Sequence, residues 1–326
     1  MKIAVIDLGT NTFKLLIAQI SKRGPIVPLF KDKIPVKLGE GGINNNEISH
    51  TPFLRGINAM KFHKQNIDTF KVDKIYAFAT SAIRSAKNGK KFVKKIKEET
   101  GIDVKIISGK KEAELIYYGV RQAHKMGAKK HLVMDIGGGS TEFIIGNDKK
   151  IFWKHSFDLG AARLLERINP SEPITPDEIK TLNRYLKKEL KPLFDELEKH
   201  PVDALVGSSG SFDSMAEMIY HRYHTKENPL VKTDYTFNAD YFEQMYHLII
   251  TSNYEQRMQI KGLAPMRVEM IVVAVVFIRY ILKKVGIQEM YLSSYSLKEG
   301  ILYTIMKEIK EDKPLLTPKL KTLKAE

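Results

Sequence analysis

The chain of 326 residues alternates between stretches with the two-residue apolar period of strands and stretches with the longer period of helices. Its first half predicts three antiparallel strands, a helix, a strand, a helix, a strand and a helix. The ranges, in that order, are 2–20 and 25–36 for the three strands, then 49–67, 74–80, 89–100, 104–108 and 110–124.

The second half repeats this order with further helices added. Hairpin strands are predicted over 131–157, helices from 161 and over 176–200, a strand at 203–206, helices over 211–223, 239–251 and 266–284, a strand at 289–293 and a final helix from 297 to about 310. Because the same succession of elements occurs twice, the sequence predicts a duplicated domain.

Three strands, helix, strand, helix, strand and helix is the order of the ribonuclease-H-like domain. Two such domains flanking a cleft make the actin-like ATPase (ASKHA) architecture, so we expect this α/β fold. The first domain is predicted over 1–126, joined by the last helix at 297–312, and the second over 127–296, with Gly127 as the hinge. Residues 313–326 lack periodicity and are expected to form a mobile tail.

Two hairpins, one in each half, share an apolar strand, an aspartate at its end, a glycine- or hydroxyl-rich turn and a second apolar strand. The polar positions of the first are Asp7, Asn11, Thr12 and Lys14, and those of the second are Asp135, Gly137, Gly138, Gly139, Ser140 and Glu142. Glycine lets the backbone approach a ligand closely, and free N–H groups and hydroxyls suit phosphate oxygens. An aspartate beside such a turn can hold a divalent cation, directly or through water. One such hairpin is more often only a turn, but two of them facing one cleft predict a polyphosphate site.

Three further segments carry polar residues between a strand and a helix. Arg84 follows a predicted strand and suits a phosphate because its planar fork donates two hydrogen bonds, but an exposed arginine on a capped helix is an equal alternative. Ser208, Ser209 and Gly210 form either an anion-binding nest or only a tight turn. Glu112 lies in the first turn of a helix, where its position alone favours no more than an interaction with the helix dipole.

Taken together and in order, these segments resemble the exopolyphosphatase and guanosine pentaphosphate phosphohydrolase (Ppx/GppA) family. The segments that carry the resemblance are 6–13, 79–84, 108–113, 135–142, 159–164 and 294–300. The resemblance implies hydrolysis of a terminal phosphoanhydride in polyphosphate or in guanosine pentaphosphate (pppGpp), and the sequence leaves open which. It also implies that Glu112 is catalytic.

The same resemblance implies that Asp135 and Glu142 position a metal and a water molecule. With Asp7 opposite, they are expected to hold Mg²⁺, with Mn²⁺ as an alternative, because carboxylate oxygens suit these ions. The backbone N–H groups of the two turns and the guanidinium of Arg84 would then hold the remaining phosphate oxygens.

The chain departs from the family pattern at several positions. Lys14 stands where the family usually has arginine, which replaces a planar fork with a point charge and is expected to weaken phosphate binding. Lys111 replaces a common glutamate, and residues 267–269 read Arg-Val-Glu rather than Arg-Ala-Asp. Without the C-terminal helical extension of long members, the chain is expected to be the short two-domain form, and the sequence leaves processive action on very long chains open.

Composition narrows the remaining alternatives. Lysine and arginine number 53 against 38 aspartates and glutamates, a net charge of +15 that favours a polyanionic partner. Nucleic acid is disfavoured because no nucleic-acid motif is visible and the lysines are scattered over predicted helices. An actin-like ATPase or kinase, and a non-enzymatic polyanion-binding protein, remain the alternatives.

Two further features bear on the compartment. The absence of cysteine excludes disulfides, thiolate catalysis and cysteine metal sites, and with no visible signal peptide we expect a cytoplasmic protein. The most apolar run, 270–278, is too short to span a bilayer, so no membrane association is expected. The helix that contains it belongs either to the core or to a homodimer interface.

Overall fold

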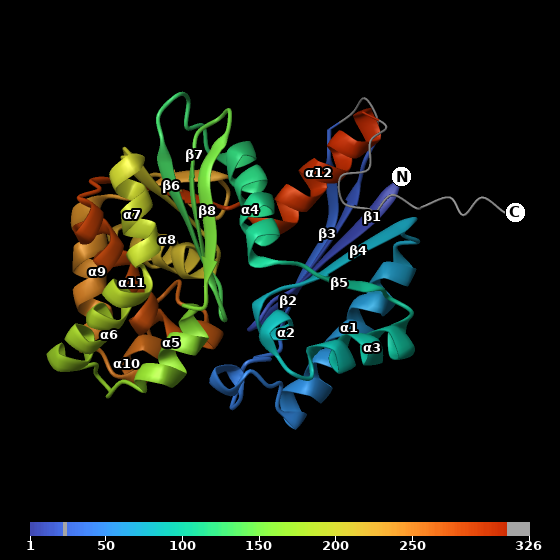
Figure 1. The fold of residues 1–326 in the computed structure, drawn as a ribbon, viewed down its shortest axis with the longest axis horizontal. Helices are drawn as coiled ribbons and strands as arrows, with labels where there is room; N and C mark the ends of the chain where they lie inside the picture. The colour runs from blue at the N-terminus through green and yellow to red at the C-terminus, as the bar shows by residue number, and fades with distance from the viewer. Residues whose placement is uncertain (22–24, 312–326) are drawn as a thin grey trace, which may run out of the picture.

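The computed structural model describes residues 1–21 and 25–311, so the tail predicted at 313–326 lies outside the described residues. The first half of the chain forms a five-stranded sheet with the order β3-β2-β1-β4-β5 (Figure 1). Its strands are β1 (Lys2–Leu8), β2 (Thr12–Gln19), β3 (Val27–Pro35), β4 (Lys74–Ala79) and β5 (Val104–Ile106). The first three strands are antiparallel, and β1, β4 and β5 run parallel.

The second half forms a six-stranded sheet with the order β10-β11-β9-β6-β7-β8. Its strands are β6 (His131–Ile136), β7 (Thr141–Gly146), β8 (Ile151–Phe157), β9 (Ala204–Ser208), β10 (Asp234–Thr236) and β11 (Glu289–Ser293). The order of β8, β7, β6, β9 and β11 repeats that of the first sheet, with the same antiparallel and parallel pairings. The predicted duplicated ribonuclease-H-like fold is therefore confirmed. The antiparallel edge strand β10 was not predicted, because its sequence Asp-Tyr-Thr offers a single apolar position, whereas the equally short β5 lies in an apolar run.

Helices cover both sheets. Those of the first half are η1 (Ile43–Asn45), α1 (His50–Thr69), α2 (Ser81–Ser85), α3 (Gly89–Thr100) and α4 (Gly109–Ala123). Those of the second half are α5 (Ala161–Ile168), α6 (Pro176–Glu189), α7 (Lys191–Lys199), α8 (Gly210–Tyr223), α9 (Ala239–Thr251), α10 (Tyr254–Met258), η2 (Pro265–Arg267), α11 (Met270–Val285) and α12 (Leu297–Glu311).

Two helix predictions need correction. The single helix predicted over 176–200 is two helices, because the chain leaves the helical conformation at Leu190 and Pro192 in the first turn of α7 cannot donate a backbone hydrogen bond. The helix predicted over 266–284 begins with the short η2 turn, and only α11 is α-helical.

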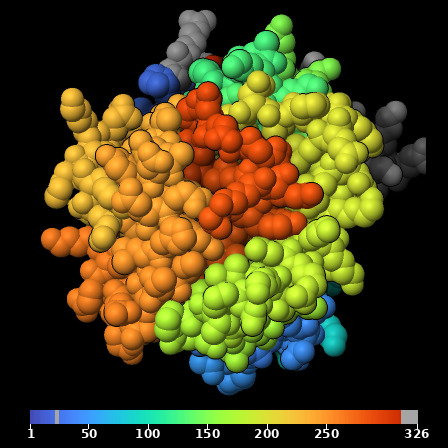
Figure 2. Space-filling view, turned by 90° about the vertical axis from the view of Figure 1, so that its left-hand side faces the viewer, coloured from blue at the N-terminus to red at the C-terminus, as the bar shows by residue number. Residues whose placement is uncertain are grey.

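Helix α11 belongs to the core. Its residues from Ile271 to Ile278 are all buried, and it packs against α5, α6, α8 and α9. In Figure 2, which views the second half from outside, the orange-red α11 segment lies between the orange segment of α9 and α10 and the yellow-green segment of α6 and α7. No helix within residues 1–21 and 25–311 is long and apolar enough to cross a membrane.

Helices α4 and α12 lie between the two sheets (Figure 1). Helix α4 belongs to the first half in sequence but packs against β7 and β8 of the second sheet, whereas α12 follows the second half and packs against β1. Their apolar side chains share one cluster with Val5 of β1 and Val133 of β6. The two halves are thus joined by a common core, although the exact domain boundaries remain a prediction.

The two helices cross at a contact between glycines. A Cβ on Gly119 of α4 would lie 2.0 Å from the carbonyl oxygen of Ser296, and a Cβ on Gly300 of α12 would lie 1.7 Å from that of Leu115. Both obstacles are backbone atoms, which cannot rotate away. The close approach of α4 and α12 therefore requires glycine at both positions.

We expect Gly300→Ala to destabilise the protein by about 1–3 kcal/mol, the usual cost of overpacking a core. The sign of the change in unfolding free energy is diagnostic, because replacing glycine by alanine in a freely exposed helix would instead stabilise the protein by about 1 kcal/mol. Urea unfolding of the parent and the variant measures the difference, with Gln122→Ala on the exposed side of α4 as the control. An unchanged or higher midpoint for Gly300→Ala would contradict this crossing geometry.

Candidate active site

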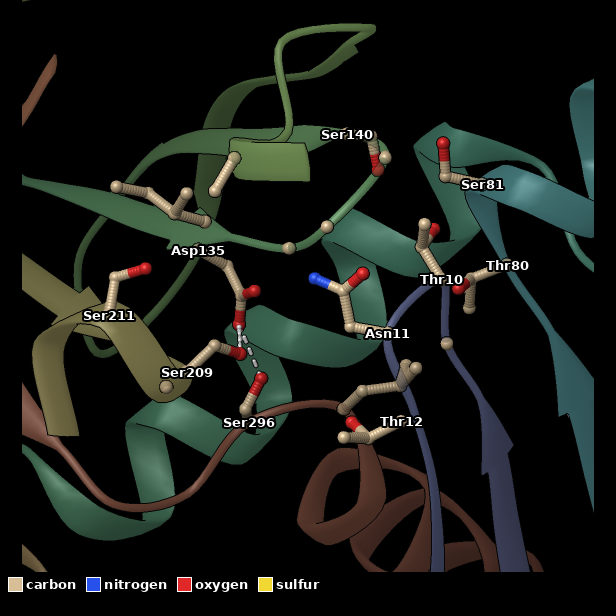
Figure 3. A pocket seen from close by; sticks show the side chains of 18 of the residues that line it. Thr10, Asn11, Thr12, Thr80, Ser81, Asp135, Ser140, Ser209, Ser211 and Ser296 are labelled. Atoms are coloured by element: carbon tan, nitrogen blue, oxygen red, sulfur yellow. Dashed lines mark hydrogen bonds between the residues drawn. The ribbon is translucent and has the colours of Figure 1, made fainter. Parts of the chain in front are cut away.

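A narrow pocket of about 100 Å³ lies where the turns of the two duplicated hairpins meet. Figure 3 shows Thr10, Asn11 and Thr12 of the first turn on one side and Asp135, Ser209 and Ser296 on the other. The residues predicted from sequence that line this pocket are Asp7, Asn11, Thr12, Lys14, Glu112, Asp135, Gly137, Gly138, Gly139, Ser140, Glu142, Ser209 and Gly210. Arg84 and Ser208 do not line it and lie behind it.

The two turns have the same internal geometry. The N–H of Gly9 donates to the carbonyl of Thr12 at 3.1 Å, and the N–H of Gly137 donates to the carbonyl of Ser140 at 3.0 Å. Both turns therefore keep the same hydrogen bond although their sequences differ. This equivalence extends the duplication from the order of strands to single backbone groups.

The glycines of the second turn allow the turns to touch across the pocket. A Cβ on Gly138 would lie 2.6 Å from the side-chain nitrogen of Asn11, and one on Gly139 would lie 2.6 Å from the hydroxyl of Thr10. Gly160 packs against the other side of this turn, where a Cβ would lie 2.4 Å from the carbonyl of Gly138. The consecutive glycines thus bring backbone groups of one half against side chains of the other.

Asp135 is held by three hydroxyl groups at the end of β6. Its Oδ2 accepts a hydrogen bond from Ser208 at 2.6 Å. It also accepts hydrogen bonds from Ser209 at 2.8 Å and from Ser296 at 2.5 Å, both of which Figure 3 shows. Ser209 adopts φ 69° and ψ 178°, a conformation that side chains rarely take, and such strain is typical of functional sites. The hydroxyls leave Oδ1 of Asp135 for other partners.

Ser296 was not predicted as a site residue. Its segment belongs to the resemblance, but a serine just before a helix gives no sign that its hydroxyl reaches an aspartate in a distant strand. Only the packing of α12 between the sheets brings the two together.

The strand pairs behind the two turns place different charges at equivalent positions. Lys14 lies opposite Asp7 in the β1–β2 register, and its Nζ is 3.7 Å from Oδ2 of Asp7. Glu142 lies opposite Asp135 in the β6–β7 register. The first pair is complementary, whereas two like charges facing each other across strands are destabilising.

Glu112 enters the pocket from the first turn of α4 and is paired with Arg84. Nη1 of Arg84 donates to Oε2 of Glu112 at 2.6 Å and to the carbonyl of Ile107 at 3.2 Å. The immediate partner of Arg84 is therefore a glutamate, and its role as a phosphate ligand stays a prediction.

Glu142 is held by two hydroxyl groups. The hydroxyls of Ser140 and Ser156 donate to Oε1 of Glu142 at 2.7 Å and 2.6 Å.

Burial dominates the protonation of these acids. It raises the pKa of Glu112 to about 7, although the guanidinium of Arg84 acts in the opposite direction. Burial, followed by the charge of Glu112, raises the pKa of Glu142 well above its usual range. Burial also raises the pKa of Asp7, which Lys14 partly offsets. For these three acids, burial therefore favours the protonated form more than the neighbouring cations and hydroxyls favour the charged form.

Cationic side chains gather beside the pocket. Lys37 and Arg267 line it together with Lys14, and none of the predictions had assigned a role to Lys37 or Arg267. Gly210 leaves room for the guanidinium of Arg267, because a Cβ there would overlap it. Burial, followed by the charges of Arg267 and Lys14, lowers the pKa of Lys33 to about 8.

The donor set fits a magnesium ion completed by a substrate. Within the described ranges 1–21 and 25–311, no three histidine or acidic side chains are grouped as a preformed metal site. Asp135, Glu142 and Asp7 nevertheless line one pocket and are all buried. Mg²⁺ commonly takes one or two protein carboxylates and obtains its other ligands from water and phosphate, so a closed protein cage is not needed.

Comparison with known proteins places the chain among phosphatases. Residues 16–309 match the Ppx/GppA phosphatase family. An exopolyphosphatase from Cytophaga hutchinsonii is 38% identical with a TM-score of 0.91, covering 94% of this chain and 98% of that one. The Ppx/GppA family member from Aquifex aeolicus is 27% identical with a TM-score of 0.78, covering 96% of this chain and 99% of that one. A Haemophilus influenzae protein provisionally named an exopolyphosphatase is 28% identical over 306 residues, 94% of this chain and 92% of its own length.

The raised pKa of Glu112 predicts a specific dependence of stability on pH. The folded protein holds this proton more tightly than the unfolded chain, so the stabilising contribution is complete below pH 4.5, the ordinary pKa, and is lost as the pH rises through about 7. Relative to Glu112→Gln, which carries no titrating proton, the parent should lose about 3 kcal/mol of unfolding free energy over this interval.

Urea unfolding between pH 4.5 and 8 in EDTA measures this difference. Glu166→Gln, an exposed position on α5, is the matched control and should follow the parent. Parallel curves for the parent and Glu112→Gln would show that Glu112 has no elevated pKa.

Proposed function

The chain belongs to the Ppx/GppA phosphatase family, and we propose that it releases terminal orthophosphate from inorganic polyphosphate. The name of the Cytophaga relative, which shares most of its length and shape with this chain, supports this substrate. The observation that carries the proposal is that the buried Glu112 shares one pocket with the turns of both duplicated hairpins. A terminal phosphoryl group is small enough to enter this pocket, while the rest of an anionic chain extends past the cations beside it.

Glu112 is proposed as the general base. A pKa of about 7 places it near neutral pH, where a carboxylate can both exist and accept a proton. It would take the proton of a water molecule that attacks the terminal phosphorus, while the phosphoanhydride bond on the opposite side breaks. Arg84 is a positioning residue, because its hydrogen bond fixes the orientation of the Glu112 carboxylate.

The two turns would hold the oxygens of the terminal phosphate. Gly138, Gly139, Asn11 and Thr12 line the pocket from opposite halves, and Lys14, Lys37 and Arg267 supply positive charge. Positioning and charge neutralisation are the main requirements of phosphoryl transfer, since the transition state is loose and strongly anionic.

Asp135, Glu142 and Asp7 are proposed to hold Mg²⁺, or Mn²⁺ in its place. When bound, such an ion supplies charge neutralisation at the phosphate oxygens. The three serine hydroxyls fix the carboxylate of Asp135, and the hydroxyls of Ser140 and Ser156 fix that of Glu142. Conversion of pppGpp to ppGpp is a second reaction of the same pocket, because both substrates end in the same anhydride.

Phosphate release from the purified protein with Mg²⁺ tests the proposal. Short polyphosphate, long polyphosphate, pppGpp and ATP are compared at equal concentrations of ends. Release from polyphosphate supports the proposed function, and additional release from pppGpp adds the second reaction. Hydrolysis of ATP alone would instead favour an actin-like ATPase, and salt-sensitive RNA binding without any hydrolysis would favour a polyanion-binding protein.

We expect Glu112→Gln to lower the rate of phosphate release about a hundredfold to ten-thousandfold, because a positioned general base is lost. The amide preserves the size of the side chain, so polyphosphate binding should remain. Glu166→Gln removes the same charge from the surface and should keep the parental rate. Near-parental phosphate release by Glu112→Gln would show that Glu112 is not the general base and only interacts with the N-terminal turn of α4.

Asp135→Asn and Glu142→Gln should each raise the Mg²⁺ concentration that gives half-maximal activity. Loss of a ligand or of a group that orients one typically costs about tenfold to a hundredfold in metal affinity. Titration of phosphate release with Mg²⁺ measures this, again with Glu166→Gln as the control. Unchanged Mg²⁺ midpoints in both variants would remove these residues from the metal site.

A further inference from the structure

A second cavity, of about 490 Å³, lies on the other side of the α4–α12 helix pair. Both helices contribute to both cavities: Glu112 and Leu297 face the catalytic pocket, whereas Tyr118 and Tyr303 line the second cavity. The third wall is the turn between β7 and β8. We call this cavity the rear groove and define it by Lys111, Glu114, Tyr117, Tyr118, Arg121, Lys149, Lys150, Ile151, Tyr303, Thr304 and Lys307.

The charge of the rear groove is strongly positive. Its lining contains five cations and one acid, Glu114. That acid is already engaged, because Lys111 donates to one of its oxygens at 2.8 Å and Lys154 to the other at 2.5 Å. Because Glu114 is already paired with these two lysines, it does not neutralise the other four cations of the groove, which are Arg121, Lys149, Lys150 and Lys307. Nζ of Lys307 also lies 3.9 Å from Oε1 of Glu311, but this ion pair is exposed and contributes little to stability.

The turn that carries two of these lysines is rigidly built. The backbone N–H groups of Lys149 and Lys150 donate to Oδ1 of Asn147 at 2.9 Å and 3.0 Å. The carbonyl of Asn147 accepts a hydrogen bond from the hydroxyl of buried Tyr117 at 2.6 Å, which ties the turn to α4. Arg121 in turn donates to the Tyr117 hydroxyl at 3.3 Å. The nearby carboxylate of Asp148 is turned away to the N–H groups of Met126 and Gly127.

Size, charge and lining agree on one class of ligand. The volume is within the range of small-molecule sites, and lysine with arginine in an otherwise polar-aromatic cavity suits phosphate groups. Tyr118 and Tyr303 contact each other with ring centroids 5.9 Å apart and offer apolar surface beside the cations. We propose that the rear groove is a second, non-catalytic site that binds a small polyphosphorylated anion between the β7–β8 turn, α4 and α12.

This proposal does not rest on the catalytic activity, so binding is tested without turnover. Hydrogen–deuterium exchange is measured with inorganic tripolyphosphate and with ATP, each in EDTA. We expect protection of 146–151 and of 303–307, in addition to any protection of the catalytic turn at 137–142. Absence of protection at 146–151 with both probes would overturn the proposal.

A paired variant assigns the protection to the rear groove. Lys149→Gln with Lys307→Gln removes one cation from each of two walls. The probe concentration that gives half-maximal protection at 146–151 should rise about tenfold or more, because two charge-assisted contacts are lost. Protection at 137–142 should remain. The control is Lys90→Gln with Lys91→Gln, an equal charge change on exposed residues of α3, and it should leave both midpoints unchanged. Equal weakening in both double variants would mean that general charge, not the rear groove, attracts the anion.

The two probes also distinguish the source of the phosphates. A lower midpoint for ATP than for tripolyphosphate, abolished by Tyr303→Leu, would assign the rear groove to a nucleotide whose base contacts the tyrosines. Equal midpoints would assign it to an inorganic oligophosphate. Protection by a polyglutamate peptide, but by neither phosphate compound, would overturn the proposal in favour of an acidic protein partner.

Discussion

The burial of several carboxylates in one narrow pocket is the constraint on which the rest of the structure depends. Asp7, Glu112, Asp135 and Glu142 all line the same small volume, and each is at most 7% exposed. Charges removed from water are costly unless they are paired or hydrogen-bonded. The serine hydroxyls around Asp135 and Glu142, the arginine on Glu112 and the lysine beside Asp7 are the compensation that the protein itself provides. The compensation is incomplete, because burial raises the pKa values of Asp7, Glu112 and Glu142 despite these partners.

The duplication explains how such a pocket can be assembled. Two copies of one hairpin keep the same turn hydrogen bond, and their different side chains then divide the tasks. The first copy carries Lys14 opposite its aspartate, whereas the second carries Glu142 opposite its own. A single hairpin could supply one of these environments but not both, because opposite strand positions hold only one pair.

The α4–α12 pair connects this chemistry to the rest of the molecule. Glu112 and Ser296 lie at the ends of these helices that face the catalytic pocket, and the glycine crossing behind them lets the two backbones touch. The rear groove is formed from the same two helices. A ligand there would contact the elements that position Glu112 and Ser296, although it would lie on the other side of the helix pair.

The sequence by itself determined the elements, their repetition and most of the pocket lining. Apolar periodicity located the strands and helices to within a few residues, and the twofold hairpin pattern identified Asp7, Asp135 and the glycines between Ile136 and Ser140, because these features are local and each strand shows its own period. Where these local signals were weak, the prediction from sequence failed. Pro192 divided a helix that the apolar pattern joined, and β10 offers only one apolar position in its three residues.

Only the tertiary structure decided which distant groups meet. The contact of Arg84 with Glu112, the hydroxyl of Ser296 on Asp135 and the position of Arg267 against Gly210 all join segments far apart in the chain. Side-chain type and spacing cannot give these contacts, since they arise where the shared core holds α4 and α12 between two sheets. The raised pKa of Glu112 belongs to the same category: a glutamate in the first turn of a helix is ordinary in sequence, and its chemistry changes only because folding removes it from water.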